Sequence, residues 1–167
     1  YDFIRKRLSI LVSKDDKHLM VTKGALQNVL SVCSSAETSD GKIVDLASVK
    51  EQIQQGFEKQ SNKGFRILGV AYRDVGSDQV ITNDHEAAMT FSGFLVLFDP
   101  PKPGIADTIK KLNHLGISLK IITGDNKLVA ANVSQQVGFS NPQLLTGSDL
   151  RSMSDEALQK RVNDISI

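Results

Sequence analysis

The sequence predicts a mixed α/β fold in two parts, a mainly antiparallel sheet followed by a smaller parallel α/β unit. Two apolar alternating runs, Leu8–Val12 and His18–Thr22, flank the polar stretch Lys14–Lys17, which is the pattern of a β-hairpin. Further along, the apolar runs Phe91–Phe98 and Ile117–Ile122 are separated by a helical repeat. A helical connection of that length predicts a right-handed crossover that leaves the two strands parallel.

Between these landmarks the first part alternates helices and strands. Helices are expected over Leu26–Cys33 and Leu46–Gln60, where apolar residues recur at steps of three and four. The polar stretch Ser34–Lys42 is expected to be a loop, and Phe65–Tyr72 a strand. Val75–Ala88 lacks periodicity and is expected to be a surface excursion.

The second part is expected to continue with helices and short strands. Helical spacing covers Ile105–Leu115, Val129–Val137 and Ser152–Val162, and the last of these begins with a polar capping pattern. Pro142–Thr146 is expected to be a third parallel strand, and Ile165–Ile167 is a candidate fourth.

The composition is that of a soluble globular chain, with 40% hydrophobic residues, 23% charged residues and a net charge of +1 in 167 residues. No apolar run approaches the roughly 20 residues that a membrane-spanning helix needs, and no secretory leader is expected. The balanced charge predicts no nucleic-acid partner. The single Cys33 excludes an intramolecular disulfide and suits buried packing in a reducing cytosol.

Three groups of residues could carry chemistry. Thr123–Asn126 follows a predicted parallel strand and precedes a helix, where phosphate binding is favoured, although all four residues are also common in turns. Lys23 and Gly24 stand at a strand end before a helix, where glycine allows close backbone approach to a ligand. Arg66 is the lone charge in an apolar strand, so it is either an edge residue or a paired one.

These motifs, taken together, resemble the P-type ATPases. Asp99–Lys102 reads Asp-Pro-Pro-Lys, and Thr123–Asp125 follows one helix and one strand later, as in that family. Lys23–Ala25 is similar to the family's adenosine-pocket motif. The next residues depart from the usual Pro-Glu, and with the opening Tyr1–Ser9 they resemble the bacterial magnesium-transporting branch. The resemblance covers nearly the whole chain.

The resemblance implies an architecture and a reaction. Residues 1–97 would be a partial nucleotide-binding domain, an antiparallel sheet with helices, and residues 98–167 part of a haloacid-dehalogenase-like phosphorylation domain. The intact protein would couple ATP hydrolysis, through an aspartyl-phosphate and with Mg²⁺ as cofactor, to transport of a cation, expected to be Mg²⁺. The chain would then be the cytoplasmic portion of a bacterial inner-membrane protein. Its partners would be ATP and the transmembrane, actuator and remaining phosphorylation domains of the same polypeptide.

The resemblance also assigns the nucleotide site. Tyr1 would stack on adenine, with Phe3 as a competing aromatic, and Lys6 would stand near the base. Lys23 and Gly24 would line the adenosine pocket.

The phosphate end of the site is assigned in the same way. Arg66 would offer its guanidinium to the nucleotide phosphates. Thr123, Gly124 and Asp125 would serve catalysis in the phosphoryl pocket of the intact enzyme.

Two other classes of protein share some of these features. A complete haloacid-dehalogenase-like phosphatase would need a nucleophilic Asp-x-Asp near the start of a strand, which the sequence does not contain. A non-catalytic nucleotide-binding module would keep Lys23 and Gly24 but would not need Thr123–Asp125.

The reaction leads to the first prediction. The family's nucleophile motif, Asp-Lys-Thr-Gly-Thr, and its Mg²⁺ motif, Gly-Asp-Gly, do not occur in the sequence, so we expect this chain alone to hydrolyse no ATP. It should also form no acid-stable phosphoenzyme when incubated with γ-labelled ATP and Mg²⁺. Label retained on the chain after acid precipitation would mean that a nucleophilic aspartate lies within it.

Overall fold

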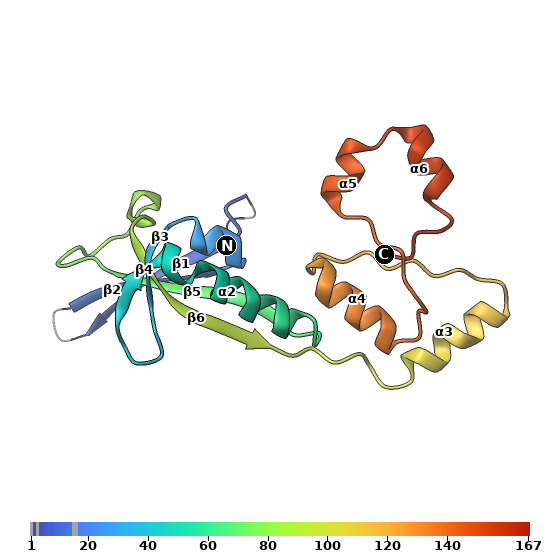
Figure 1. Ribbon diagram of the computed structural model, residues 1–167, viewed down its shortest axis with the longest axis horizontal. Helices are drawn as coiled ribbons and strands as arrows, with labels where there is room; N and C mark the ends of the chain where they lie inside the picture. The colour runs from blue at the N-terminus through green and yellow to red at the C-terminus, as the bar shows by residue number, and fades with distance from the viewer. Residues whose placement is uncertain (1, 3, 15–16) are drawn as a thin grey trace. The chain divides into compact units, whose positions relative to one another are not determined.

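The computed structural model describes residues 2, 4–14 and 17–167. Its contacts separate two compact units, Tyr1–Lys59 with Ile67–Leu97, and Gln60–Arg66 with Phe98–Ile167. Figure 1 labels the elements in chain order. They are β1 (Arg7–Lys14), β2 (Lys17–Gly24), α1 (Leu26–Leu30), β3 (Cys33–Glu37), β4 (Ile43–Asp45), α2 (Leu46–Ser61), β5 (Arg66–Asp74), the 3₁₀ helix η1 (Asn83–His85), β6 (Met89–Leu97), α3 (Ile105–His114), α4 (Lys127–Gln136), α5 (Gly147–Ser152) and α6 (Asp155–Arg161).

The first unit is built on a six-stranded sheet in the order β1-β2-β5-β6-β3-β4. The pairs β1–β2, β2–β5 and β3–β4 are antiparallel, whereas β3 and β6 are parallel. The predicted mixed fold with a mainly antiparallel sheet is therefore confirmed for this unit.

Helices α1 and α2 pack on one face of the sheet, and α2 runs along it in Figure 1. Side chains alternate across β2: Met20 and Thr22 are buried, while the neighbouring Leu19 and Lys23 are exposed. The core combines side chains from both helices and four strands: Met20, Leu26, Val29, Leu30, Ala36, Ile53, Ala71, Met89 and Phe91. On the other face, β1 and β2 present exposed side chains, which makes it the uncovered face of this unit: Leu8, Ile10, Val12, Leu19 and Lys23.

The expected loop over Ser34–Lys42 is wrong for Ser34–Glu37, which belongs to β3, whereas Thr38–Lys42 is the loop that joins β3 to β4 in a hairpin. The polar composition concealed a strand whose hydroxyl groups bond to the neighbouring strand, as Ser35 Oγ does with Thr90 Oγ1 at 2.9 Å. Ala36 supplies the buried position of this strand. The preceding helix is correspondingly shorter than predicted and ends at Leu30.

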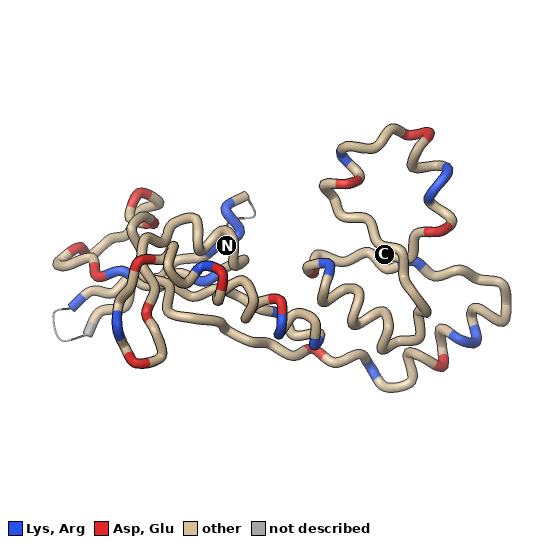
Figure 2. The backbone as a smooth tube through the Cα atoms, in the orientation of Figure 1, with Lys and Arg blue, Asp and Glu red and all other residues tan. Residues whose placement is uncertain are grey.

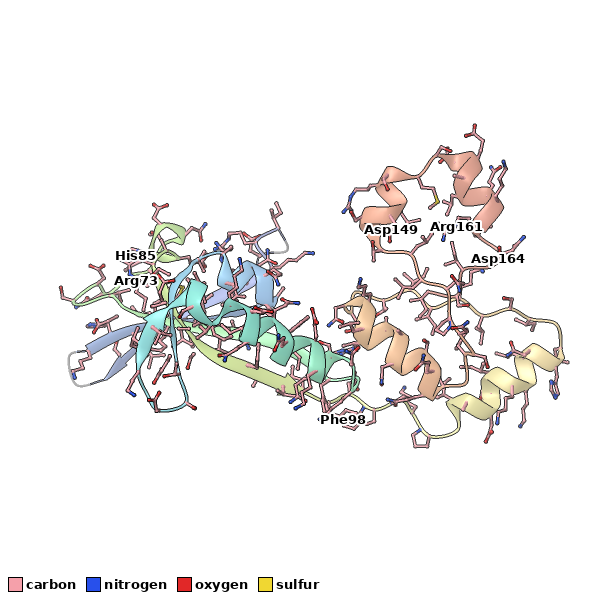
Figure 3. The ribbon with its side chains drawn as sticks, in the orientation of Figure 1. Arg73, His85, Phe98, Asp149, Arg161 and Asp164 are labelled. Carbon is pink, nitrogen blue, oxygen red and sulfur yellow. The ribbon has the colours of Figure 1, made fainter. Side chains whose placement is uncertain are left out.

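The expected surface excursion over Val75–Ala88 is attached to the unit more firmly than its composition suggested. Val75 and Glu86 are buried. Arg73 of β5 donates from Nη1 to the carbonyl oxygens of His85, at 3.1 Å, and Ala87, at 2.9 Å. Figure 3 labels Arg73 and His85, which lie next to each other.

In the second unit the predicted helices are present as α3, α4 and α6, and α5 is an additional one. The Asn126 side chain caps α4 by accepting hydrogen bonds from Leu128 N at 3.0 Å and Val129 N at 3.1 Å. None of the described helices combines the length and the apolar character that a membrane span requires.

The predicted strands of the second unit are wrong as continuous strands. Ile117–Ile122 and Pro142–Thr146 form no ladders, and a single bridge, which is parallel, joins Gln143 to Ile165. Single hydrogen bonds join Ile121 N to Ser166 O at 2.8 Å and Leu145 N to Ile167 O at 3.0 Å. The three segments thus lie side by side, but contacts of two or three residues are too short for a stable sheet.

The predicted crossover between Phe91–Phe98 and Ile117–Ile122 is also wrong. The parallel neighbour of β6 is β3, which belongs to the same unit. Alternation of apolar residues predicts that a segment is extended, but it does not say which segment it pairs with.

The two faces of β2 lead to a prediction about stability. Met20→Ala removes a side chain that is 1% exposed, so we expect it to lower the free energy of unfolding by about 2–5 kcal/mol. Leu19→Ala, one residue away on the uncovered face and 36% exposed, should change it by about 0.5 kcal/mol or less. Urea unfolding of the two variants checks this, and equal losses would contradict the one-sided core.

Candidate functional site

The uncovered face of β1, β2 and β5 carries a lysine between two apolar side chains. The register places Leu8 of β1 opposite Lys23 of β2, and Lys23 opposite Val70 of β5. Residues opposite one another across a sheet share a face, so these three side chains form one row. Leu8 is 37% exposed, Lys23 is exposed and Val70 is half-buried. The apolar side chains of Leu8 and Val70, with the cation of Lys23 between them, suit a planar, partly polar ligand.

Sequence reasoning found Lys23 but missed Leu8 and Val70. The alternation in each strand did indicate which residues face away from the core. Which strands are neighbours, and in what register, is a property of the folded sheet, so the row itself had no signal in the sequence.

Gly24 and Lys6 approach each other closely at the end of this row. Lys6 has a positive φ of 51°, and its carbonyl oxygen accepts a hydrogen bond from Ala25 N at 3.0 Å. A Cβ built on Gly24 would lie 2.4 Å from Lys6 O and 2.7 Å from Arg7 Cα. Only glycine leaves room for this backbone contact. The structure therefore brings together Lys6, Lys23 and Gly24, three of the residues expected at the nucleotide site.

Asp2 shapes the turn that carries Lys6. Its Oδ1 accepts hydrogen bonds from Ile4 N at 2.8 Å and Arg5 N at 3.0 Å, and its Oδ2 accepts one from Arg5 Nε at 2.8 Å. Hydrogen bonds from the Arg5 side chain and backbone lower the pKa of Asp2 to about 2, so the carboxylate is charged at neutral pH. The predicted aromatic contacts, Tyr1 and Phe3, lie outside the described residues.

A second group of polar residues lies within the second unit, around Arg66. Its Nε lies 2.7 Å from Asp125 Oδ1, and its Nη1 lies 3.1 Å from Asp99 Oδ2. Thr123 Oγ1 donates to Asp125 Oδ2 at 2.9 Å and accepts from Asp125 N at 3.1 Å. Of the two possibilities open for Arg66, an edge residue or a paired one, the structure shows the paired one.

The contacts of Arg66 connect the two motifs of the second part of the chain. Asp99 belongs to the Asp-Pro-Pro-Lys motif and Asp125 to the Thr-Gly-Asp motif, although the two are 26 positions apart. A cavity of about 280 Å³ opens beside them. Its lining is Gly64, Arg66, Asp99, Pro100, Pro101, Lys102, Asp125, Val129 and Val133.

The two groups of residues differ in their charge balance. Two carboxylates surround the single guanidinium of Arg66, whereas the row of Leu8, Lys23 and Val70 carries a cation only. Figure 2 shows that both positive and negative residues occur in each of the two units. An anionic ligand can meet Lys23 directly, whereas at Arg66 it would have to displace a carboxylate.

Comparison with known proteins identifies the family. A family model described as "P-type ATPase, cytoplasmic domain N" matches residues 1–104. The chain belongs to the P-type ATPase family. Among its relatives, the "Magnesium-transporting ATPase, P-type 1" of Escherichia coli K12 is 34% identical over 164 residues, which cover 95% of this chain and 18% of that protein. The protein of the same name from Salmonella typhimurium LT2 is 35% identical over the same length, with the same coverage.

A relative named for calcium transport matches as well. The "Calcium-transporting ATPase 1" of Bacillus cereus is 27% identical over 170 residues, which cover 100% of this chain and 19% of that protein. The chain thus spans about a fifth of the length of the P-type ATPases it matches. The predicted family is confirmed, and the family-model match contains the whole row of Leu8, Lys23 and Val70.

The close approach at Gly24 leads to a prediction. Gly24→Ala would force the Lys6 turn away from β2, so we expect a loss of about 1–3 kcal/mol in the free energy of unfolding and faster hydrogen exchange at the Ala25 amide. Gly124→Ala adds the same methyl group where no atom lies within 4 Å, and it should be close to neutral. Urea unfolding and amide exchange measure both. An unchanged Ala25 amide in Gly24→Ala would contradict the predicted contact.

Proposed function

We propose that this chain is the ATP-binding cytoplasmic portion of a cation-transporting P-type ATPase and that the transported cation is Mg²⁺. The proposal is carried by one observation, the exposed Lys23 between Leu8 and Val70, beside the Gly24–Lys6 contact. The names of the relatives from Escherichia coli and Salmonella typhimurium support magnesium as the cation. In the intact protein, ATP hydrolysis through an aspartyl-phosphate would drive transport.

The nucleotide would lie on the uncovered face of the sheet. The purine would cover Leu8 and Val70, which removes apolar surface from water, while the Lys23 ammonium would meet polar atoms of the nucleotide. The space that a side chain of Gly24 would fill is taken by the Lys6 turn, so Gly24 would serve the site by letting that turn approach β2. Tyr1 stays a predicted stacking partner for adenine, and Lys6 a predicted cation near the base.

The phosphate end remains a proposal for Arg66, Thr123, Gly124 and Asp125. Arg66 can present two parallel N–H donors, as the contacts of its Nε and Nη2 with the two carboxylate oxygens of Asp125 illustrate, and phosphate oxygens accept the same geometry. We assign Thr123, Gly124 and Asp125 to the phosphoryl pocket of the intact enzyme. In the described part of the chain, no three His, Cys, Asp or Glu side chains gather as a metal site would require, so no Mg²⁺ ligand is assigned here.

The domain assignment follows from the same proposal. Residues 1–97 would be part of the nucleotide-binding domain, and residues 98–167 part of a haloacid-dehalogenase-like phosphorylation domain. The parallel bridge between Gln143 and Ile165 supports the second assignment, because such a domain is a parallel α/β unit. The remaining domains of the polypeptide and the bacterial inner membrane would complete the transporter.

The nucleotide site leads to a prediction about affinity. Lys23→Ala should weaken ATP binding about ten- to a hundredfold, because a charge-assisted contact of this kind contributes about 1.5–3 kcal/mol. Lys17→Ala is the matched control: Lys17 is an exposed lysine of β2 that faces the same way, at the other end of the strand. It should bind ATP as the unsubstituted chain does.

Titration of ATP into both variants, followed by NMR or calorimetry, separates the outcomes. Equal affinities for the two variants would refute the proposed site. Arg66→Ala, measured in the same way, tests the proposed phosphate contact independently.

A further inference from the structure

Glu86 is a buried carboxylate to which the proposed site assigns no role. It is 6% exposed and lies between η1 and β6. Arg5 Nη1 donates a hydrogen bond to its Oε2, Arg7 Nε donates to the same oxygen at 2.6 Å, and Ser9 Oγ donates to Oε1 at 2.7 Å. Both oxygens therefore accept hydrogen bonds from groups of one short segment, 77 to 81 positions away in the sequence.

The backbone on both sides of Glu86 is fixed as well. Arg73 of β5 holds the carbonyl oxygens of His85 and Ala87, the two residues that flank Glu86. Ser9 is in turn hydrogen-bonded to Thr22 of β2, with 2.8 Å between the hydroxyl oxygens. The carboxylate is thus a fixed point of the sheet, and the segment containing Arg5 and Arg7 is attached to it.

The attached segment contains Lys6. Arg5 and Arg7 flank Lys6, whose positive φ is needed for its carbonyl to meet Ala25 N and for its backbone to pass over Gly24. A lysine rarely adopts this conformation by itself, so the surrounding contacts must hold it there. The two ion pairs of Glu86 are placed directly before and after this residue.

In this segment the carboxylates balance the charges of the two arginines but not that of Lys6. Asp2 pairs with Arg5, and Glu86 pairs with both arginines. Two carboxylates thereby neutralise two guanidinium groups and leave the Lys6 ammonium as the excess charge of the described segment. Burial would raise the pKa of Glu86, but the hydrogen bonds from Arg5, Ser9 and Arg7 outweigh it and lower the pKa, so the group is ionised at neutral pH.

We propose that Glu86 is a positioning residue for the nucleotide site: by clamping Arg5 and Arg7 it holds the Lys6 turn against Gly24 and aims Lys6 at the ligand. This inference rests on the proposed nucleotide binding at Lys6, Lys23 and Gly24. A buried ion pair contributes little net stability, since apolar side chains would fill the same space as well. The ion pairs instead fix how the segment of Arg5 and Arg7 lies against the segment that contains Glu86.

Coulomb's law and positioning predict opposite effects for Glu86→Gln. Loss of a negative charge near the site should by itself strengthen the binding of an anionic nucleotide. If Glu86 holds the Lys6 turn, the variant should bind ATP roughly three- to tenfold more weakly, the size of effect expected for coupled neighbours. Asp84→Asn is the matched control, because it removes the same charge from an exposed position of η1. It should bind ATP as well as the unsubstituted chain or slightly better.

The experiment titrates ATP into the full 167-residue chain and follows backbone amides by NMR. The Ala25 amide, which bonds to Lys6 O, reports whether the turn is docked, and the Val29 and Ala71 amides report whether the core is intact. In Glu86→Gln we expect faster exchange at Ala25, unchanged exchange at Val29 and Ala71, and weaker ATP binding. Lys6→Ala should weaken binding in the unsubstituted chain but cause no further loss in the Glu86→Gln background, whereas Lys23→Ala should keep its full effect there.

The outcomes separate this inference from the proposed function. If Lys6→Ala and Lys23→Ala leave ATP affinity unchanged, the nucleotide site is wrong, and the Ala25 amide alone then decides whether Glu86 holds the turn. If both weaken binding but Glu86→Gln binds ATP equally or more tightly, the positioning role is overturned. Should Glu86→Gln fail to fold, Arg5→Gln keeps the pair between Arg7 and Glu86, and it must show the same changes on a smaller scale. An unaltered Ala25 amide and affinity in that variant would also overturn the inference.

Discussion

The register of β1, β2 and β5 is the constraint on which the candidate site depends. It places an apolar side chain on each side of Lys23, and it brings Lys6 and Arg7, at the start of β1, over Gly24. A slip of one residue would turn Lys23 toward α1 and α2 and would bury a charge in the core. The helices on the opposite face therefore do more than stabilise the unit: by requiring Met20 and Thr22 inside, they keep Lys23 outside.

Buried polar side chains of the first unit fix how its strands and connecting segments lie against one another. Thr22 and Glu86 are buried but hydrogen-bonded, and among the described side chains no buried nitrogen or oxygen atom lacks a partner. The hydroxyl pair of Ser9 and Thr22, together with Glu86, joins β1, β2 and the segment before β6 at one point. Apolar packing alone would bring these segments together without specifying their angle.

In the second unit, Arg66 performs a similar joining role in an exposed setting. It connects the Asp-Pro-Pro-Lys and Thr-Gly-Asp motifs through Asp99 and Asp125, but with 48% of its side chain exposed these ion pairs add little stability. The contacts are better understood as a geometric link between two motifs of the P-type ATPase family. In the proposed site the same guanidinium would exchange the Asp125 oxygens for phosphate oxygens, since both accept two parallel donors.

The sequence by itself determined most of the helices and the hairpin of β1 and β2, because these depend on local spacing, and its motifs carried the resemblance to the family. It also singled out Lys23, Gly24 and Arg66, since a glycine at a strand end and a lone charge in an apolar strand can be recognised from neighbouring residues in the sequence. It missed the hairpin of β3 and β4, whose hydroxyl groups find partners only in the folded sheet, and it paired Phe91–Phe98 with the wrong strand. Only the tertiary structure decided that Leu8 and Val70 flank Lys23, and that Glu86 reaches back to Arg5 and Arg7. Those contacts join residues far apart in the chain, and strand alternation specifies a face without specifying a neighbour.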